Sequence, residues 1–201
     1  MKVNEWLDFF KNNSEKKLFS LSDLSQLTGI NKPSLSVQLS RLTKKNIIKR
    51  ASKDWYENPF NNPTNEEISM VIRYPSYISM EYLLSKKNIL SQAVQTYTLI
   101  TTKLPYTYQK KDKTFEYHQI GKNLFFGYVK ENKITLAEPE KALLDIIYIR
   151  YLKNNEFSFN SIKSLIDDMA IEEINLKKLD RYSNIFGRKM NETINKLGLL
   201  I

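Results

Sequence analysis

The stretch Lys32–Lys53 constrains the fold of this chain more than any other. Leu35, Leu39 and Leu42 recur there at intervals that place them on one face of a helix. The residues between them are mostly small, polar or basic, as on a helix whose other face meets solvent. The spacing therefore predicts an amphipathic helix over residues 32–45 with the three leucines buried.

The segment after this helix is predicted to form a β-hairpin. The β-branched residues Ile47 and Ile48 lead into an extended piece over residues 49–51, and Ser52-Lys53 supplies a turn. The chain then returns through Trp55 and Tyr56, whose aromatic side chains are common in strands. We interpret the helix and the hairpin as a recognition helix followed by a β-wing.

The same stretch, Lys32–Lys53, carries only positive charge. It contains seven cationic side chains and no Asp or Glu, and the whole chain has a formal net charge of +9. A basic surface attracts polyanions, although lysines at a helix end can also satisfy its dipole and solvate the surface. Because the charge coincides with the helix and hairpin pattern, we favour a nucleic-acid interface, with DNA as the target and RNA as the alternative.

The residues before this helix complete a helix-turn-helix pattern. Residues 3–12 have a heavily aromatic face and predict a short helix. Ser20 or Ser22 can cap a second helix, Gly29 ends it, and Pro33 suits the first turn of the helix that follows. Two helices, a glycine turn, a third helix and a hairpin form the order of a winged helix-turn-helix domain.

The predicted DNA contacts come from the open face of the third helix and from the hairpin. Serine, glutamine and arginine can hydrogen-bond base edges, whereas lysine neutralises phosphates. We expect Ser34, Gln38 and Arg41 to reach base edges or nearby phosphates, and the cations that follow to hold the DNA backbone. The complete predicted DNA-binding set is Lys32, Ser34, Ser36, Val37, Gln38, Arg41, Lys44, Lys45, Lys49, Arg50 and Lys53.

A segment rich in asparagine and proline, residues 57–66, is predicted to link two domains. We expect an α+β protein with a winged helix-turn-helix domain over residues 1–64 and a mixed α/β domain over residues 65–201. In the second domain, residue patterns predict a small, mainly antiparallel sheet with strands near 96–102, 115–117, 124–129 and 134–136. Helices are predicted near 80–88, 139–152, 160–169, 176–186 and 189–197.

The composition excludes several classes of site. The chain has no Cys, which excludes disulfides, thiolate zinc sites and thiol catalysis. Asp145 and Arg150 interrupt the longest apolar run, and the N-terminus lacks a signal-peptide core, so we expect a cytoplasmic protein without a membrane span. None of the five glycines has the spacing of a phosphate-binding loop, and we expect no cofactor.

Several polar residues invite a catalytic or metal-binding interpretation. Glu140, Lys141 and Asp145 suggest an acid–base site, but Lys141 and Asp145 are four residues apart on a predicted helix, which a salt bridge explains more simply. His118 is the only histidine, and no further metal ligands group near it in the sequence. The adjacent pair Asp167-Asp168 diverges by about 100° on a helix. We therefore expect no enzymatic activity and no metal site.

A second basic segment interleaves lysines with tyrosines between positions 103 and 113. This combination suits phosphate contact together with base stacking, and a solvated hairpin loop is the alternative interpretation. The candidate residues of this second nucleic-acid surface are Lys103, Tyr106, Tyr108, Lys110, Lys111 and Lys113.

Motifs along most of residues 5–153 resemble those of one protein family. They are the N-terminal helix and hairpin pattern, the segments Pro75–Leu84 and Tyr97–Thr102, the triplet Phe125-Phe126-Gly127, and the run Ala137-Glu138-Pro139-Glu140-Lys141-Ala142-Leu143-Leu144-Asp145. Through these motifs the chain resembles the AbiEi family of bacterial transcriptional regulators, the antitoxins of type IV toxin–antitoxin systems linked to abortive phage infection. The run from Ala137 to Asp145 is the most specific of them.

The resemblance implies a repressor that binds inverted repeats of double-stranded DNA in the promoter of its own operon, with DNA contacts from residues 32–41. It also implies a C-terminal domain that opposes a nucleotidyltransferase-like toxin without a stable complex, which makes the basic segment between positions 103 and 113 a candidate antitoxicity surface as an alternative to nucleic-acid binding. A single winged helix reads few base pairs, so we expect a dimer, or monomers that bind cooperatively to repeated half-sites. The alternative is an antitoxin or adaptor that works mainly by direct protein binding through its C-terminal domain.

Overall fold

The computed structural model describes residues 1–153 and 158–199 of the chain. The chain divides into two compact units, Met1–Ile72 (unit 1) and Arg73–Ile201 (unit 2). Helices and two β-sheets make up the described residues, so the fold is α+β as predicted. In this described part of the chain, no helix is both long enough and apolar enough to cross a membrane.

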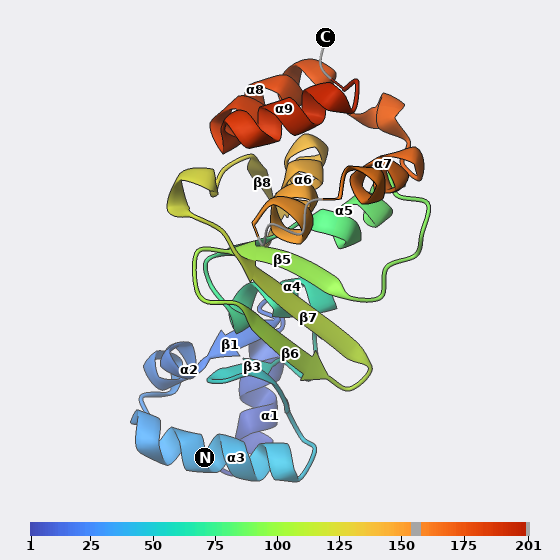
Figure 1. Ribbon diagram of the computed structural model, residues 1–201. Coiled ribbons are helices and arrows are strands. Elements are labelled where there is room, and N and C mark those ends of the chain that lie inside the picture. The colour runs from blue at the N-terminus through green and yellow to red at the C-terminus, as the bar shows by residue number, and fades with distance from the viewer. Residues whose placement is uncertain (154–157, 200–201) are drawn as a thin grey trace. The chain divides into compact units, whose positions relative to one another are not determined.

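Unit 1 alternates helices with a small sheet (Figure 1). In chain order its elements are α1 (Val3–Asn12), β1 (Leu18–Ser20), α2 (Leu21–Thr28), α3 (Lys32–Lys44), β2 (Lys49–Ser52), β3 (Trp55–Glu57) and α4 (Asn65–Ile72). The three strands form an antiparallel sheet in the order β1-β3-β2. The predicted helix over residues 3–12, the helix that begins at Lys32 and the hairpin after it are all confirmed.

The core of unit 1 is aromatic at its centre. The ring of Trp6 stacks on Phe10 at a centroid distance of 5.8 Å, and Phe10 meets Phe19 edge-on at 5.6 Å. The predicted leucine stripe of α3, Leu35, Leu39 and Leu42, is buried against this cluster. Because the stripe occupies one side of α3, the opposite side of the helix is left to solvent.

The predicted linker over residues 57–66 belongs to unit 1, and the boundary lies after Ile72 rather than after residue 64. Asn58 is fully buried, and its side-chain Nδ2 donates hydrogen bonds of 3.0 to 3.1 Å to three backbone oxygens. The helix α4, which the sequence analysis missed, packs against β2. The segment was predicted to be a linker because it contains few apolar residues. In the structure it is held in unit 1 by the hydrogen bonds of the buried Asn58 side chain instead.

The sheet of unit 2 is larger than predicted, and it is mixed rather than mainly antiparallel. Its strands are β4 (Ser76–Ile78), β5 (Tyr97–Thr101), β6 (Tyr106–Lys110), β7 (Lys113–Gln119), β8 (Tyr128–Glu131) and β9 (Ile134–Ala137). They lie in the order β6-β7-β5-β4-β9-β8, with β4–β9 and β5–β7 parallel. The strands β6 and β7 form an antiparallel hairpin, and its second strand, β7, pairs with β5. Because the chain reverses its direction twice between β5 and β7, these two strands run parallel.

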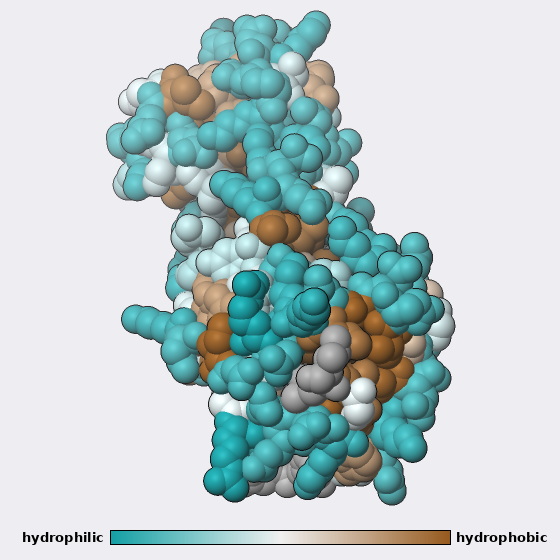
Figure 2. Space-filling model, turned by 90° about the horizontal axis from the view of Figure 1, so that it is seen from above, coloured by the Kyte–Doolittle hydropathy of each residue, from teal (hydrophilic) through white to brown (hydrophobic). Residues whose placement is uncertain are grey.

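The helices of unit 2 are α5 (Met80–Lys86), α6 (Pro139–Ile146), α7 (Phe159–Asp167), α8 (Leu176–Phe186) and α9 (Arg188–Lys196). The helix α6 continues as a π-helical segment, Ile147–Leu152. It packs against α5 and α8, and α8 packs against α9 (Figure 1). The surface on the side of α8 and α9 is mostly hydrophilic, with hydrophobic side chains gathered in separate patches (Figure 2). Burial on nearly all sides of α6 makes it the core helix of the unit, as its sequence predicts.

Some predicted elements of unit 2 differ from the structure. Residues 124–129 were expected to form a strand, but a 3₁₀ turn, Lys122–Leu124, precedes the later strand β8. The strands β4 and β6 were not predicted; β6 lies where a solvated loop was the alternative interpretation. Leu199, near the C-terminus, is buried.

Candidate nucleic-acid interface

Local hydrogen bonds and the leucine stripe fix the orientation of α3. The side chain of Asn31 caps the helix, since its Oδ1 accepts a hydrogen bond of 3.0 Å from the backbone N–H of Ser34. Pro33 occupies the first turn, where a missing N–H is tolerated. The buried leucines then turn Lys32, Ser36 and Arg41 outward, and all three side chains are exposed.

The structure places nearly all of the predicted α3 contacts on one open face. Ser34 and Val37 are exposed as well, and Val37 is 52% accessible. Lys44 and Lys45 extend this face at the C-terminal end of the helix. The face therefore combines small, polar, aliphatic and cationic side chains.

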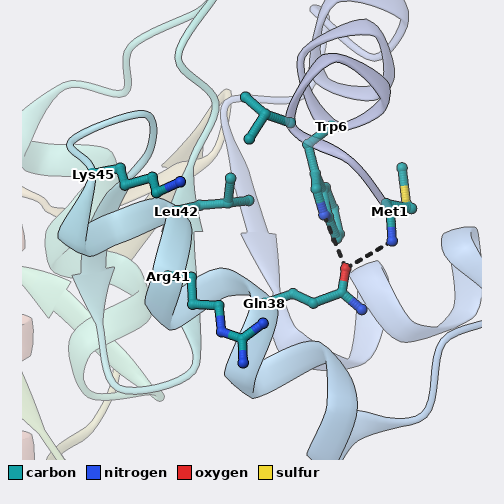
Figure 3. A pocket seen from close by; sticks show the side chains of 7 residues that line it. Met1, Trp6, Gln38, Arg41, Leu42 and Lys45 are labelled. Carbon is teal, nitrogen blue, oxygen red and sulfur yellow. Dashed lines mark hydrogen bonds between the residues drawn. The ribbon is translucent and has the colours of Figure 1, made fainter.

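Gln38 differs from the other predicted base-reading residues because its side-chain oxygen is already engaged. The Oε1 atom accepts hydrogen bonds from the Trp6 indole at 3.2 Å and from the Met1 ammonium at 3.1 Å (Figure 3). Both donors belong to unit 1. Gln38 thus ties α3 to the start of α1, and its carbonyl oxygen is occupied before any ligand binds.

The hairpin β2–β3 presents the remaining predicted cations. Lys49, Arg50 and Lys53 are exposed, and the turn lies at Lys53-Asp54 rather than at Ser52-Lys53. Asp54 adopts a left-handed backbone conformation with φ of 61°. Its carboxylate lies 4.0 Å from the Arg50 guanidinium, so an acid directly after the acid-free stretch offsets part of its charge.

Seven exposed cations consequently share α3 and the hairpin: Lys32, Arg41, Lys44, Lys45, Lys49, Arg50 and Lys53. Arg50 has the ion pair with Asp54, whereas no other described acidic residue forms an ion pair with a member of this set. Unpaired cations on one surface create a positive potential that attracts polyanions. We call this set, together with Ser34, Ser36 and Val37, the basic surface.

The second predicted surface lies on the β6–β7 hairpin at one edge of the sheet of unit 2. Tyr106 and Tyr108 occupy alternate positions of β6, and their ring centroids are 6.4 Å apart. Lys110 pairs with Lys113 across the strands, Lys111 follows in the turn, and Lys103 lies in the exposed segment before β6. The structure therefore distributes the six residues along this hairpin at a sheet edge, with Lys103 before β6 and the other three lysines at the turn end, rather than gathering them in one solvated loop.

In unit 2, the predicted pair of Lys141 and Asp145 is confirmed, but it is completely buried. The Lys141 ammonium donates a short hydrogen bond to the Asp145 carboxylate and another, of 2.8 Å, to the Tyr77 hydroxyl. Tyr77 and Ser79 donate hydrogen bonds of 3.1 and 2.8 Å to the second oxygen of Asp145. All four residues are 0% exposed, so a substrate has no access to them in this conformation.

Aromatic rings surround the ammonium of Lys141. Its Nζ lies 5.3 Å from the ring centroid of Tyr77, 5.2 Å from that of Phe126 and 4.8 Å from that of Phe186. Burial lowers the pKa of Lys141, while the charge of Asp145 acts in the opposite direction. Burial likewise raises the pKa of Asp145, and the hydrogen bonds from Lys141, Ser79 and Tyr77 counteract that rise.

The other candidate polar residues have ion-pair partners or lie apart. His118 is half-buried, and its Nε2 is 3.5 Å from a carboxylate oxygen of Glu116. Burial, assisted by Arg150, lowers the pKa of His118 despite that carboxylate. Asp167 and Asp168 are exposed at the end of α7. His118 is therefore paired with a carboxylate, Asp167 and Asp168 face solvent, and these three residues are not grouped into one site.

Tyr77 and Ser79 were not predicted as partners of Asp145. Both residues lie at β4, which is distant from Asp145 in the sequence, and no local spacing connects them. The only signal was their place in the segment Pro75–Leu84, which belongs to the family resemblance. Comparison with models of known protein families gives no match, and no curated protein matches the chain significantly.

Proposed function

We propose that unit 1 is a winged helix-turn-helix domain and that the protein is a sequence-specific, DNA-binding transcriptional repressor. The observation that carries this proposal is the basic surface, where seven exposed cations share a helix and the hairpin after it. The order of helices and strands in unit 1 agrees with a winged helix, in which α3 enters the major groove and β2–β3 forms the wing. The proposed function contains no catalytic step.

Within the basic surface we assign roles by side-chain chemistry and position. Arg41 lies in the last turn of α3 on the open face and can read guanine with two hydrogen bonds. Ser34 and Val37 suit a hydrogen bond and an apolar contact to base edges, while Lys44, Lys45, Lys49 and Lys53 suit phosphates. Gln38 is removed from the base-reading set because its carbonyl oxygen holds Trp6.

The proposal is tested by fluorescence anisotropy with a duplex from the chain's own promoter and a scrambled duplex of equal length. With about five phosphate contacts, the logarithm of the affinity falls against the logarithm of the salt concentration with a slope of about −4.5. Arg41→Ala should weaken promoter binding about tenfold or more and leave scrambled-duplex binding nearly unchanged. Lys53→Ala should weaken both and reduce the slope by about 0.9.

Lys122→Ala is the matched control, because it removes an exposed positive charge from unit 2. Its affinities for both duplexes should equal those of the native protein. Equal losses on both duplexes for Arg41→Ala would contradict its role in base recognition. A slope near zero for the native protein would contradict the entire interface.

We further propose that the protein autoregulates its operon as the antitoxin of a type IV, AbiE-like system. The support is the resemblance of residues 5–153, and above all of the run Ala137–Asp145, to that family. Unit 2 would then oppose a nucleotidyltransferase-like toxin encoded beside this gene. The test measures rescue of growth when the full chain, carrying substitutions in unit 2, is co-expressed with the neighbouring gene. Variants that lose rescue but still repress the promoter would separate toxin neutralisation from repression.

Direct protein binding is the second candidate function, and one observation favours it. The strand β8 ends the sheet of unit 2, and all four of its residues, Tyr128–Glu131, are exposed. An exposed strand edge can accept a further strand from a partner. Co-elution of a stoichiometric complex with the neighbouring gene product would favour this function over the type IV mechanism, which needs no stable complex.

A further inference from the structure

A cavity of about 180 Å³ lies between the start of α1 and the side of α3 (Figure 3). Met1, Val3 and Trp6 line it from the N-terminal end, and Gln38, Arg41, Leu42 and Lys45 line it from the side of α3. The indole N–H of Trp6 points at the Gln38 oxygen, so the hydrogen bond between them fixes one wall. A cavity of about 150 Å³ with apolar walls accommodates benzene, so this one is large enough for a single aromatic ring.

The wall of the cavity has two chemical parts. Met1, Val3, Trp6 and Leu42 supply the apolar side chains; Met1 and Val3 are exposed, whereas Trp6 and Leu42 lie beneath them with 1% and 4% exposure. Arg41 and Lys45 are exposed cations one helical turn apart, and neither forms an ion pair with a described acidic residue. No acidic side chain lines the cavity. The Met1 ammonium also lies at this wall, where it donates a hydrogen bond to Gln38. The cavity therefore offers apolar side chains beside three positive groups, among which Arg41 and Lys45 lie on the side of α3.

We propose that this cavity binds a small organic anion with an aromatic body, of the size of benzoate, and that its occupancy releases DNA. The ring would lie against Trp6 and Leu42, and the carboxylate would lie between Arg41 and Lys45. The release of DNA rests on the proposed function, because the same two cations belong to the basic surface. The anion is an effector that competes with DNA for both of them.

The expected size of the competition follows from those two side chains. Engaging Lys45 removes about one phosphate contact, so the salt slope of DNA binding becomes shallower by about 0.9. Engaging Arg41 removes a base contact, so the affinity for the promoter falls about tenfold or more. The scrambled duplex loses only the phosphate contact and is affected less.

Binding is measured with benzoate as the probe, through the indole N–H signal of Trp6 in ¹H–¹⁵N spectra. Trp55→Phe leaves Trp6 as the only indole, because the chain has two tryptophans. We expect a saturable shift with a dissociation constant of about 1 mM or below, the range for a ligand of about nine non-hydrogen atoms. Neutral benzamide and inorganic phosphate should bind at least about tenfold more weakly, since each lacks one of the two recognised features.

Two variants separate the charge from the pocket. Lys45→Gln changes an exposed residue and should weaken benzoate while leaving benzamide unchanged, whereas Val3→Phe should fill the pocket and abolish the response to benzoate. No saturable shift up to about 20 mM benzoate, or equal shifts from benzamide or phosphate, would overturn the anion site. Unchanged promoter affinity in saturating benzoate would overturn the release of DNA. A native protein that binds no duplex at all, yet shows the saturable indole shift, would instead contradict the proposed function alone.

Discussion

Removing one member of the buried Lys141–Asp145 pair should destabilise unit 2 strongly. Lys141→Met retains the length of the side chain but leaves the Asp145 carboxylate without its counter-charge at 0% exposure. Breaking a buried pair in this way costs about 3–5 kcal/mol, because the remaining charge is uncompensated. The variant also loses the attraction of the ammonium to three aromatic rings.

A double-mutant cycle distinguishes this pairing from general sensitivity of the core. Asp145→Asn keeps acceptors for Ser79 and Tyr77 but leaves the Lys141 ammonium unpaired, so we expect a loss of about 3–5 kcal/mol here too. The double variant Lys141→Met/Asp145→Asn holds no buried charge. Its loss should fall short of the sum of the single losses by about 2–3 kcal/mol.

The two tryptophans allow the unfolding of each unit to be followed separately. Trp6 and Trp55 both belong to unit 1, so tryptophan fluorescence in urea reports on that unit, while far-ultraviolet circular dichroism reports on both. The variants should shift the circular dichroism transition and leave the fluorescence transition in place. Single losses below about 1 kcal/mol, or strictly additive losses, would refute the account of a coupled buried pair.

Two further predictions concern unit 1. Burial tends to raise the pKa of Asp23, but hydrogen bonds from Lys16 and Ser20 outweigh it and hold the pKa below its ordinary value. The stabilisation is therefore present above about pH 4 and is lost as the pH falls, so the stability gap between native protein and Asp23→Asn should shrink below about pH 4 in urea unfolding by fluorescence. Asn58→Ala removes four side-chain hydrogen bonds at a buried position, three donated by Nδ2 and one accepted by Oδ1 from the Phe60 backbone N–H, and should lower the stability of unit 1 by about 3 kcal/mol. The exposed Asn62→Ala should change it by less than about 0.5 kcal/mol. A matched effect of both asparagines in the same assay would contradict the assigned role of Asn58.

Local patterns in the sequence were sufficient for much of the helical structure. The predicted bounds of the helices at 3–12 and 176–186 equal those of α1 and α8, because each has a strong amphipathic period within its own residues. The Gly29 stop is confirmed as well, with a left-handed backbone at φ of 69°. The exposed face of α3 followed directly from its leucine stripe.

Features that depend on residues distant in the sequence were not accessible in this way. Asn58 is buried because three separate carbonyl groups around α1 accept its hydrogen bonds, and composition alone indicated a linker there. The engagement of Gln38 likewise depends on Trp6, which lies on another helix. The mixed sheet depends on which of two hairpin strands pairs with β5, a choice that strand propensity does not decide.

The run Ala137–Asp145, which carries the most specific resemblance, has a structural explanation at each of its polar positions. Glu138 accepts hydrogen bonds from Lys178 and Tyr182 of α8, and Glu140 accepts one of 3.0 Å from the backbone N–H of Asn175. Lys141 and Asp145 connect α6 with β4. Since every polar side chain of the run is engaged inside unit 2, the run specifies how α6 packs. A resemblance through this run therefore bears on the fold of unit 2, and the residues that would oppose a toxin must be sought outside the run, among the exposed residues of unit 2.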